Sequence, residues 1–366
     1  MNSADDPVGV QYDLFPFLNK CNKAHIIQIS EYINITQATR RCLYGGSYNS
    51  FLQEFSGIFA AHIAGMRVSV FIEKYFWLFL ITGIFLGLWN PVPVVMGTFL
   101  PKILLGMMLF VVYLKIDALE ILENIKNYRL MIYIMSLYMI IIPLIFYFSV
   151  KYLNEELALG ILLLTAMPAG VSAPALTDIA RGNPSLSLSL TIITQLIAPF
   201  TVPALFWLID IKDLEINKLM IFKDIALLVF IPMIISQSIK KFFPEAIKKT
   251  QHLFTAANVM LLFTFVYAAI ASQRDIILNN LYGLIWKIGV LYAVFIILHF
   301  AGYMICYKER KENRIAIAIG SAYMNNGMAI VLAASYFKPE ILVLMVLSEL
   351  PWNTLLAPFR KVVSNL

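Results

Sequence analysis

Ten long apolar runs constrain the fold of this chain more than any other feature. A helix needs about 20 apolar residues to cross the roughly 30 Å hydrocarbon core of a bilayer. Charged residues make up only 14% of the chain, whereas soluble proteins carry about a quarter. We therefore predict an all-α polytopic membrane protein with ten transmembrane helices, near residues 75–92, 97–115, 130–151, 157–180, 184–208, 220–238, 253–272, 281–305, 314–334 and 340–359.

The fourth and ninth runs are interrupted by helix-breaking and small polar residues. The interruptions are Pro168, Gly170 and Pro174 in the fourth run, and Gly320, Asn325, Asn326 and Gly327 in the ninth. A membrane helix breaks only where its freed backbone groups face protein or water, and paired broken helices frame the substrate site of many transporters. Because the two runs hold matching ranks, they predict two inverted five-helix repeats with discontinuous, crossing helices 4 and 9.

Basic residues are distributed unevenly between the loops. One alternating set of loops, with the C-terminus, holds Lys126, Arg129, Arg181, Lys240, Lys241, Lys248, Lys249, Lys308, Arg310, Lys311, Arg314, Arg360 and Lys361. The other set is poorer in basic residues, and one of its loops is acidic at Asp210 and Asp213. By the positive-inside rule, we expect a multi-pass protein of the cell inner membrane with both ends of the helical body in the cytoplasm.

Residues 1–65 differ from the rest of the chain. They are polar and mixed, and their start has neither the basic nor the apolar region of a secretory signal. From Met66 a short charged approach leads into aromatic and then apolar residues. We predict an N-terminal extension over 1–65, either poorly ordered or an over-long start, followed by the ten-helix transporter domain over 66–366.

Several other classes of protein find little support. The net charge of +6 comes from basic residues in short loops, so we expect no nucleic-acid partner. The three cysteines show no paired spacing for disulfides or zinc. There is no Gly-rich phosphate loop, no His-Glu-x-x-His motif and no paired-aspartate prenyl-transfer signature. We therefore expect neither an enzyme nor an organic cofactor.

Two blocks of sequence carry a family resemblance. The first runs from Pro168 to Pro203 and includes Gly182, Asn183 and the spaced prolines, and the second runs from Ile317 to Ala329. They resemble the bile acid:sodium symporter family, in a divergent bacterial-type form, over roughly residues 68–362. The resemblance implies ten helices, a six-helix core domain, a four-helix panel, and sodium-driven uptake of organic anions.

The departures from this family fall on its sodium ligands. The helix-five ligand positions keep their hydroxyls as Ser187 and Thr191, but the other implied side-chain positions carry Ala173, Pro174, Gly320, Met324 and Tyr138. A hard cation needs several oxygen ligands. We therefore expect at most a weak residual sodium site at Ser187 and Thr191, and sodium coupling that is altered or absent.

The hydroxyl and amide candidates each have a structural alternative. Ser187 and Thr191 lie four apart on one helical face, so both point at the fourth-helix break, or they bond to their own i−4 carbonyls. Asn325 and Asn326 line the crossing and contact substrate or ion, or they join helices by hydrogen bonds.

Glu349 is the one acid deep in the last span. A carboxylate at that depth costs about 2.5–3.5 kcal/mol on insertion scales, so a functional role is the default. An apolar setting suits a proton carrier. The alternative is a neutral acid bonded to a backbone carbonyl near Pro351.

Two further pairs of charged residues have simpler interpretations. Asp178 and Arg181 have the three-residue spacing of an ordinary ion pair, with substrate contact as the alternative. Lys102 and Lys115 are expected to extend to opposite membrane interfaces.

The combined interpretation is a secondary transporter that moves a small or amphipathic organic anion by alternating access. The predicted substrate-binding residues are Pro168, Gly170, Thr177, Asn325, Asn326 and Glu349. The coupling ion is sodium or a proton, and any coupling runs through protonation of Glu349. The alternative is a degenerate, non-transporting membrane sensor or assembly subunit.

Overall fold

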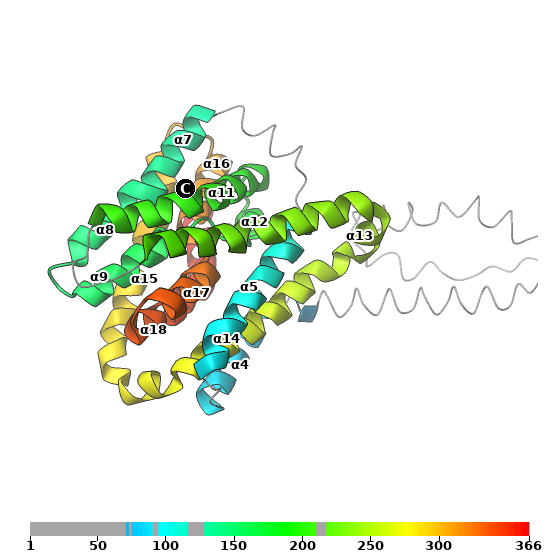
Figure 1. The fold of residues 1–366 in the computed structure, drawn as a ribbon. Coiled ribbons are helices and arrows are strands. Elements are labelled where there is room, and N and C mark those ends of the chain that lie inside the picture. The colour runs from blue at the N-terminus through cyan, green and yellow to red at the C-terminus, as the bar shows by residue number, and fades with distance from the viewer. Residues whose placement is uncertain (1–70, 73–74, 91–93, 116–127, 210–216, 366) are drawn as a thin grey trace, which may run out of the picture. The chain divides into compact units, whose positions relative to one another are not determined.

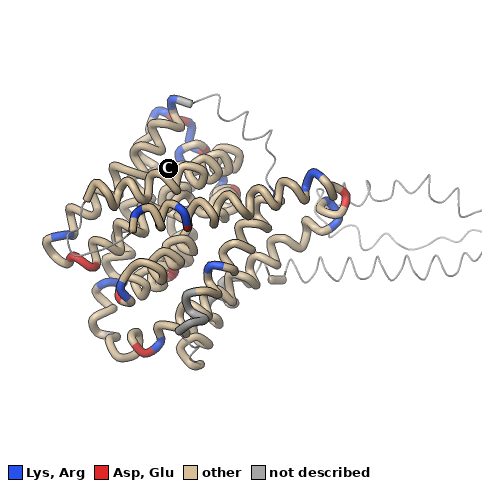
Figure 2. Tube along the Cα trace, viewed as in Figure 1, with Lys and Arg blue, Asp and Glu red and all other residues tan. Residues whose placement is uncertain are grey.

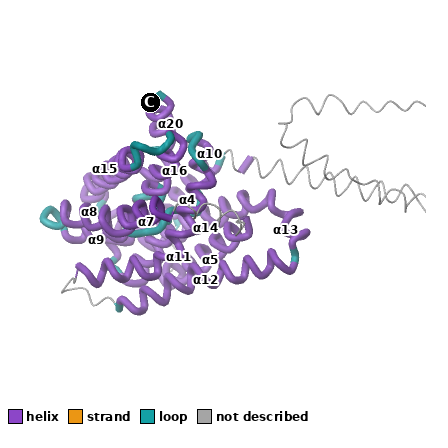
Figure 3. Tube along the Cα trace, turned by 90° about the horizontal axis from the view of Figure 1, so that it is seen from above, coloured by secondary structure: helices purple, strands orange, loops and turns teal. Residues whose placement is uncertain are grey.

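A computed structural model describes residues 71–72, 75–90, 94–115, 128–209 and 217–365. Within these ranges every regular element is a helix, apart from one isolated β-bridge between Ala169 and Met324 (Figures 1 and 3). The predicted extension over 1–65 and the acidic loop at Asp210 and Asp213 lie outside the described residues, so both remain predictions.

The helices of the first half are interrupted in the fourth run. They are α4 (Phe76–Trp89), α5 (Val94–Lys115), α7 (Tyr128–Ser136), the π-helix η3 (Leu137–Ile141), α8 (Ile142–Val150), α9 (Glu155–Thr165), α10 (Ala173–Ile179) and α11 (Pro184–Ile209). Asn154 fixes the start of α9, because its side chain accepts a hydrogen bond from the Leu157 backbone N–H at 2.7 Å.

The helices of the second half are interrupted in the ninth run and also in the last. They are α12 (Lys218–Phe242), α13 (Pro244–Thr250), the 3-10 helix η4 (Gln251–Leu253), α14 (Phe254–Asn279), α15 (Leu281–Ile305), α16 (Lys311–Ala322), α17 (Asn326–Tyr336), α18 (Pro339–Leu347), α19 (Glu349–Thr354) and α20 (Leu356–Ser364). Asn217 caps α12 in the same way, by accepting from the Leu219 and Met220 N–H groups.

Six helical stretches in the described part of the chain are long and apolar enough to cross a membrane. They are Arg129–Val150, Pro184–Ile209, Lys218–Phe242, Pro244–Asn279, Tyr282–Ile305 and Pro339–Ser364. Charged residues gather at helix ends and turns and leave most helix bodies without charge (Figure 2). The protein is therefore a polytopic helical membrane protein, while the count of ten spans remains a prediction.

The described helices pack in two groups. Helices α4, α5, α12 and α14 pack on one another through the pairs α4–α14, α5–α14 and α5–α12 (Figure 1). The others surround the broken runs, with α10 and α16 against α11, and α18 against α9 and α17. The groups meet where α5 contacts α17 and α11 contacts α12.

Lys102 has a partner that the sequence did not indicate. Its Nζ lies 2.8 Å from Asp224 Oδ2, which joins α5 to α12 by an ion pair. The extension of Lys102 to a membrane interface remains a prediction. The last run forms one long helical stretch, Pro339–Ser364, with irregular positions at Ser348 and Leu355.

Candidate functional site: the crossing of two broken helices

The first break is the non-helical stretch between α9 and α10, residues 166–172, in which turns flank the short segment 168–170. Pro168 has no backbone N–H and disfavours a helical conformation in the residue before it, so α9 ends at Thr165. Pro174 sits at the start of α10, where a missing N–H costs nothing. The sequence therefore both ends one helix and begins the next within the apolar run.

The second break lies between α16 and α17 at residues 323–325. The Asn325 side chain accepts a hydrogen bond from the Met328 N–H at 3.0 Å and caps α17. The Asn326 side chain points instead to α18 and donates to Ser348 Oγ at 3.0 Å. Both amide residues are buried, with 6% and 4% of their surface exposed.

The two breaks meet and satisfy each other's backbone. Ala169 and Met324 form an antiparallel bridge. The Gly170 N–H donates to the Tyr323 carbonyl at 2.7 Å, and the Asn325 N–H donates to the Pro168 carbonyl at 2.8 Å. Polar backbone groups freed by a broken membrane helix need such partners, so the predicted contact between the two interruptions is present.

The close approach of the two breaks requires a glycine at position 170. A Cβ atom added there would lie 2.7 Å from the Tyr323 carbonyl oxygen and 3.1 Å from that of Met324, and both are backbone atoms. The two breaks can therefore approach this closely only if residue 170 has no side chain.

One face of α11 holds the first break in place. The Thr194 hydroxyl accepts from the Ala169 N–H at 3.1 Å, and Thr191 Oγ1 reaches the Gly170 carbonyl at 3.4 Å. Gln195, which also approaches the Ala169 carbonyl, accepts a hydrogen bond from the Tyr113 hydroxyl of α5. Thr194 and Gln195 were not among the residues predicted from the sequence, although Gln195 continues the four-residue spacing of Ser187 and Thr191.

Ser187 bonds to α10 rather than to its own helix. The Thr177 hydroxyl donates to Ser187 Oγ at 3.0 Å, and both residues are fully buried. The alternative of bonding to an i−4 carbonyl is taken instead by neighbours on the same helix, Ser189 and Thr194. Ser187 and Thr191 therefore both face the broken helix, as their spacing predicted, although a role in ion binding remains a prediction.

A second polar cluster lies on the other side of the ninth-run break. Glu349 is 6% exposed, and its carboxylate accepts from Asn353 Nδ2 at 3.2 Å. The Asn326 amide also interacts with this carboxylate. The Trp352 indole N–H donates to the Met324 carbonyl at 3.3 Å, which ties α19 to the crossing. Glu349 is therefore adjacent to the break.

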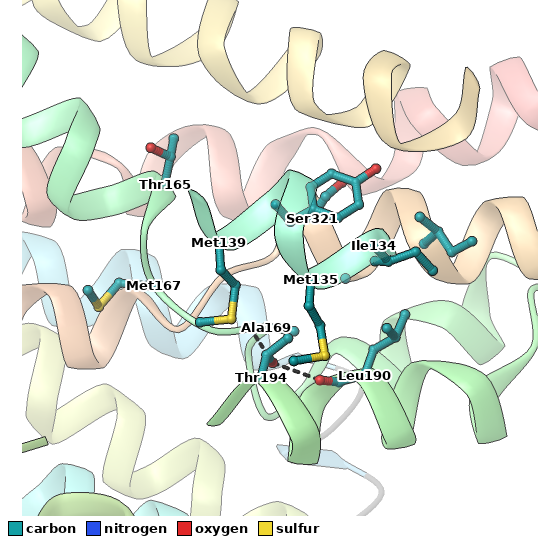
Figure 4. A pocket seen from close by; sticks show the side chains of 12 residues that line it. Ile134, Met135, Met139, Thr165, Met167, Ala169, Leu190, Thr194 and Ser321 are labelled. Atoms are coloured by element: carbon teal, nitrogen blue, oxygen red, sulfur yellow. Dashed lines mark hydrogen bonds between the residues drawn. The ribbon is translucent and has the colours of Figure 1, made fainter. Parts of the chain in front are cut away.

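Two of the residues that replace the implied sodium ligands, Tyr138 and Gly320, line a small cavity between η3, the first break and α16. Tyr138, Gly320, Met135, Met139 and Met167 contribute to its wall. Figure 4 shows Thr194 on its floor, bonded to Leu190 and Ala169. None of the residues that line this cavity in the described structure carries a carboxylate.

The predicted ion pair between Asp178 and Arg181 is absent from the described residues. Instead, the Arg181 N–H donates to the Asp178 carbonyl at 2.9 Å, and the Gly182 N–H donates to the Thr177 carbonyl at 2.8 Å. Arg181 has a φ of 61°. This is the hydrogen-bond pattern that ends a helix with a residue in the left-handed region, and the local backbone explains the spacing.

Comparison with known proteins identifies relatives over most of the helical body. The sequence model of the SBF-like CPA transporter family matches residues 74–354. The chain is also 28% identical, over 274 residues, to the "Uncharacterized sodium-dependent transporter YocS" of Bacillus subtilis (strain 168), covering 69% of this chain and 82% of that protein. The resemblance predicted from the two sequence blocks is confirmed.

Proposed function

This chain belongs to the SBF-like CPA transporter family, and from that premise we propose that it moves a small or amphipathic organic anion by alternating access. Membership makes the protein a multi-pass membrane transporter rather than an enzyme. It follows that the lipid bilayer surrounds it and that a small molecule is its cargo.

The crossing of the two broken helices is the observation that supports this proposal most directly. The breaks place helix ends, extended backbone and buried amides together in an otherwise apolar body. Transporters use such discontinuous helices to bind substrate near the bilayer midplane. On this proposal, Pro168, Gly170 and Thr177 shape the site from the α10 side, and Asn325 and Asn326 shape it from the α17 side.

An unused donor at the start of α17 favours an anionic cargo. Asn325 Nδ2 is buried and has no hydrogen-bond acceptor among the described residues, while its Oδ1 caps the helix. The N-terminus of an α-helix carries a partial positive charge. A carboxylate bound there would accept the hydrogen bond that Asn325 does not use in the described structure.

The architecture proposed for transport is ten spans in two inverted repeats. On this reading α4, α5, α12 and α14 are the panel, and the helices around the crossing are the core that rocks against it. Both ends of the helical body face the cytoplasm, as the loop charges predicted, and the membrane is the cell inner membrane.

Coupling to an ion is proposed to run through Glu349, in place of the sodium ligands implied by the bile acid:sodium symporter resemblance. Gly320 and Met324 supply no side-chain oxygen, and the cavity beside them has no carboxylate in its described lining. Ser187 and Thr191 remain as a weak residual sodium site. The name of the Bacillus subtilis relative, a sodium-dependent transporter, supports coupling to a cation.

Uptake into proteoliposomes tests this function. Labelled carboxylates, including amphipathic ring carboxylates, would be supplied under separate sodium and pH gradients. We expect saturable anion uptake that is abolished in Asn325→Asp, because that change keeps the helix cap and puts a negative charge where the free donor stood. Asn365→Ala, at the chain end, serves as the control.

Two outcomes would contradict the proposal. Transport of cations alone would overturn the anionic cargo. No transport of any solute, from protein that is folded and inserted, would favour the degenerate sensor or assembly subunit instead.

A further inference from the structure

Glu349, unlike Asp224 of α12, has no cationic partner among the described residues. Asp224 is paired with Lys102 at 2.8 Å, whereas Glu349 takes part in none of the ion pairs among the described residues. A buried charge without a partner costs several kcal/mol. Glu349 must therefore either bind a proton or have a cation beside it.

The neighbouring amides leave oxygen atoms without a donor. Asn326 Oδ1 and Asn353 Oδ1 are both buried and unpartnered in the described structure. Their Nδ2 groups face Ser348 Oγ and the Glu349 carboxylate. The Asn353 Nδ2 also donates to the Glu349 backbone carbonyl at 2.8 Å. Rotation of each amide about its Cβ–Cγ bond gives up these hydrogen bonds and exchanges the nitrogen for the oxygen, which turns the Asn353 oxygen to the carboxylate and the Asn326 oxygen to Ser348 Oγ.

A proton satisfies this cluster less well than a metal ion. Protonation gives Glu349 one O–H donor, which leaves at least one of the two amide oxygens unpaired at a cost of about 1–3 kcal/mol. A hard cation binds several oxygens at once. It can take the carboxylate, both amide oxygens and the Ser348 hydroxyl oxygen together.

The charge of the cluster indicates a monovalent ion. Glu349 is its only carboxylate, so an ion of charge +1 leaves the buried site neutral, whereas a divalent ion leaves an uncompensated positive charge. We infer that Glu349, Asn326, Asn353 and Ser348 form a sodium site at the junction of α17, α18 and α19. This inference rests on the proposed role of Glu349 in coupling, and replaces the proton of that role with sodium.

Trp352 provides a readout of sodium binding that does not depend on transport. Its indole N–H donates to the Met324 carbonyl, one turn of α19 from Glu349. The purified full-length protein would be titrated with sodium chloride against choline chloride at constant ionic strength, while tryptophan fluorescence is recorded. We expect a saturable change that disappears in Trp352→Phe, because four other tryptophans are not part of the site.

Substitutions in the cluster test which side chains bind the sodium ion. Glu349→Gln is expected to abolish the sodium response, and Asn353→Ala to weaken sodium affinity by about tenfold. Asp224→Asn changes the carboxylate of α12 that pairs with Lys102 and is expected to leave the response intact. Thermal unfolding in choline chloride checks that each variant is folded, and the partly exposed Asn353 provides a milder change should Glu349→Gln fail to fold.

Three results would overturn the inference: no sodium response in the unmodified protein, a response that survives in folded Glu349→Gln or keeps its full sodium affinity in folded Asn353→Ala, or a response lost only in Thr191→Val, which would place the ion at α11. Proteoliposome uptake distinguishes this failure from failure of the proposed function. A sodium response without transport contradicts the transport proposal, and transport without a sodium response contradicts only the sodium site.

Discussion

At the scale of single residues, Gly170 is the glycine of the crossing where an added side chain meets the closest backbone atoms. We predict that Gly170→Ala destabilises the protein by about 1–3 kcal/mol, the usual range for overpacking a filled core. The reason is that the new Cβ would meet the backbone carbonyls of Tyr323 and Met324, which cannot move aside without separating the two breaks. Thermal unfolding of detergent-purified protein measures the loss, and uptake is expected to fall with it.

Gly320→Ala is the matched control for this prediction. It lies in the other broken run, but the nearest atom to its added Cβ is Leu190 Cδ1, at 3.7 Å. We expect unchanged stability. Equal loss in both variants would show that the crossing does not have the close backbone contact described here.

The sequence predicted which residues sit at the breaks better than it predicted their partners. Pro168, Pro174 and Gly170 are visible because proline and glycine act on the local backbone. Thr177 bonding to Ser187, and Lys102 bonding to Asp224, depend on which helices become neighbours. Helical spacing shows that a side chain faces a neighbouring helix and gives no information about which helix that is.

At the scale of elements, the start of α17 depends on one side chain. Asn325→Ala removes the acceptor for the Met328 N–H and is expected to cost about 1 kcal/mol, as lost helix caps usually do. Asn325→Asp keeps a capping oxygen and is expected to retain most of the stability while losing anion uptake. Chemical or thermal unfolding separates the two effects, and equal destabilisation by both substitutions would contradict the capping role.

The end of α10 is held in a conformation that an arginine adopts at a cost. A left-handed backbone conformation costs an L-residue about 1–2 kcal/mol, and glycine escapes that cost. We predict that Arg181→Gly is neutral or stabilises the protein by up to about 1 kcal/mol, the gain being reduced by the greater freedom of glycine when unfolded. A clear fall in unfolding temperature would indicate that the arginine side chain has a role of its own.

The position of a helix could be predicted from the sequence where the length of an apolar run determines it. The sequence placed a single span over 340–359, where one helical stretch runs from Pro339 to Ser364, but it gave no sign of the irregular positions at Ser348 and Leu355 that divide α18, α19 and α20. It also gave no sign of the π-helical turn over Leu137–Ile141. Both irregularities occur where a helix packs beside the crossing, and such tertiary contacts are not encoded in local periodicity.

At the scale of the whole molecule, alternating access requires the panel to move against the core. Leu105 of α5 touches the start of α17, where its Cδ1 lies 3.1 Å from a Cβ placed on Gly327. We predict that a short thiol crosslinker between Leu105→Cys and Gly327→Cys, in a background without the native cysteines, stops uptake and that cleaving the crosslink restores it.

A crosslink inside one group of helices is the control. Gly160 of α9 and Leu344 of α18 are also in close contact, with 2.8 Å between an added Cβ and Leu344 Cδ1. The pair Gly160→Cys and Leu344→Cys is expected to crosslink without stopping transport. Inhibition by both crosslinks would argue against movement of two rigid groups.

The antiparallel pairing of the two breaks also has a consequence for biosynthesis. The fourth segment leaves the ribosome and enters the bilayer long before Tyr323 is synthesised, so the Gly170 N–H then lacks its acceptor. An unsatisfied peptide group costs several kcal/mol in hydrocarbon. Nascent chains that end before Tyr323 should therefore keep residues 166–172 in contact with water or with the insertion machinery, and only the arrival of the ninth segment allows the fourth to settle in the membrane.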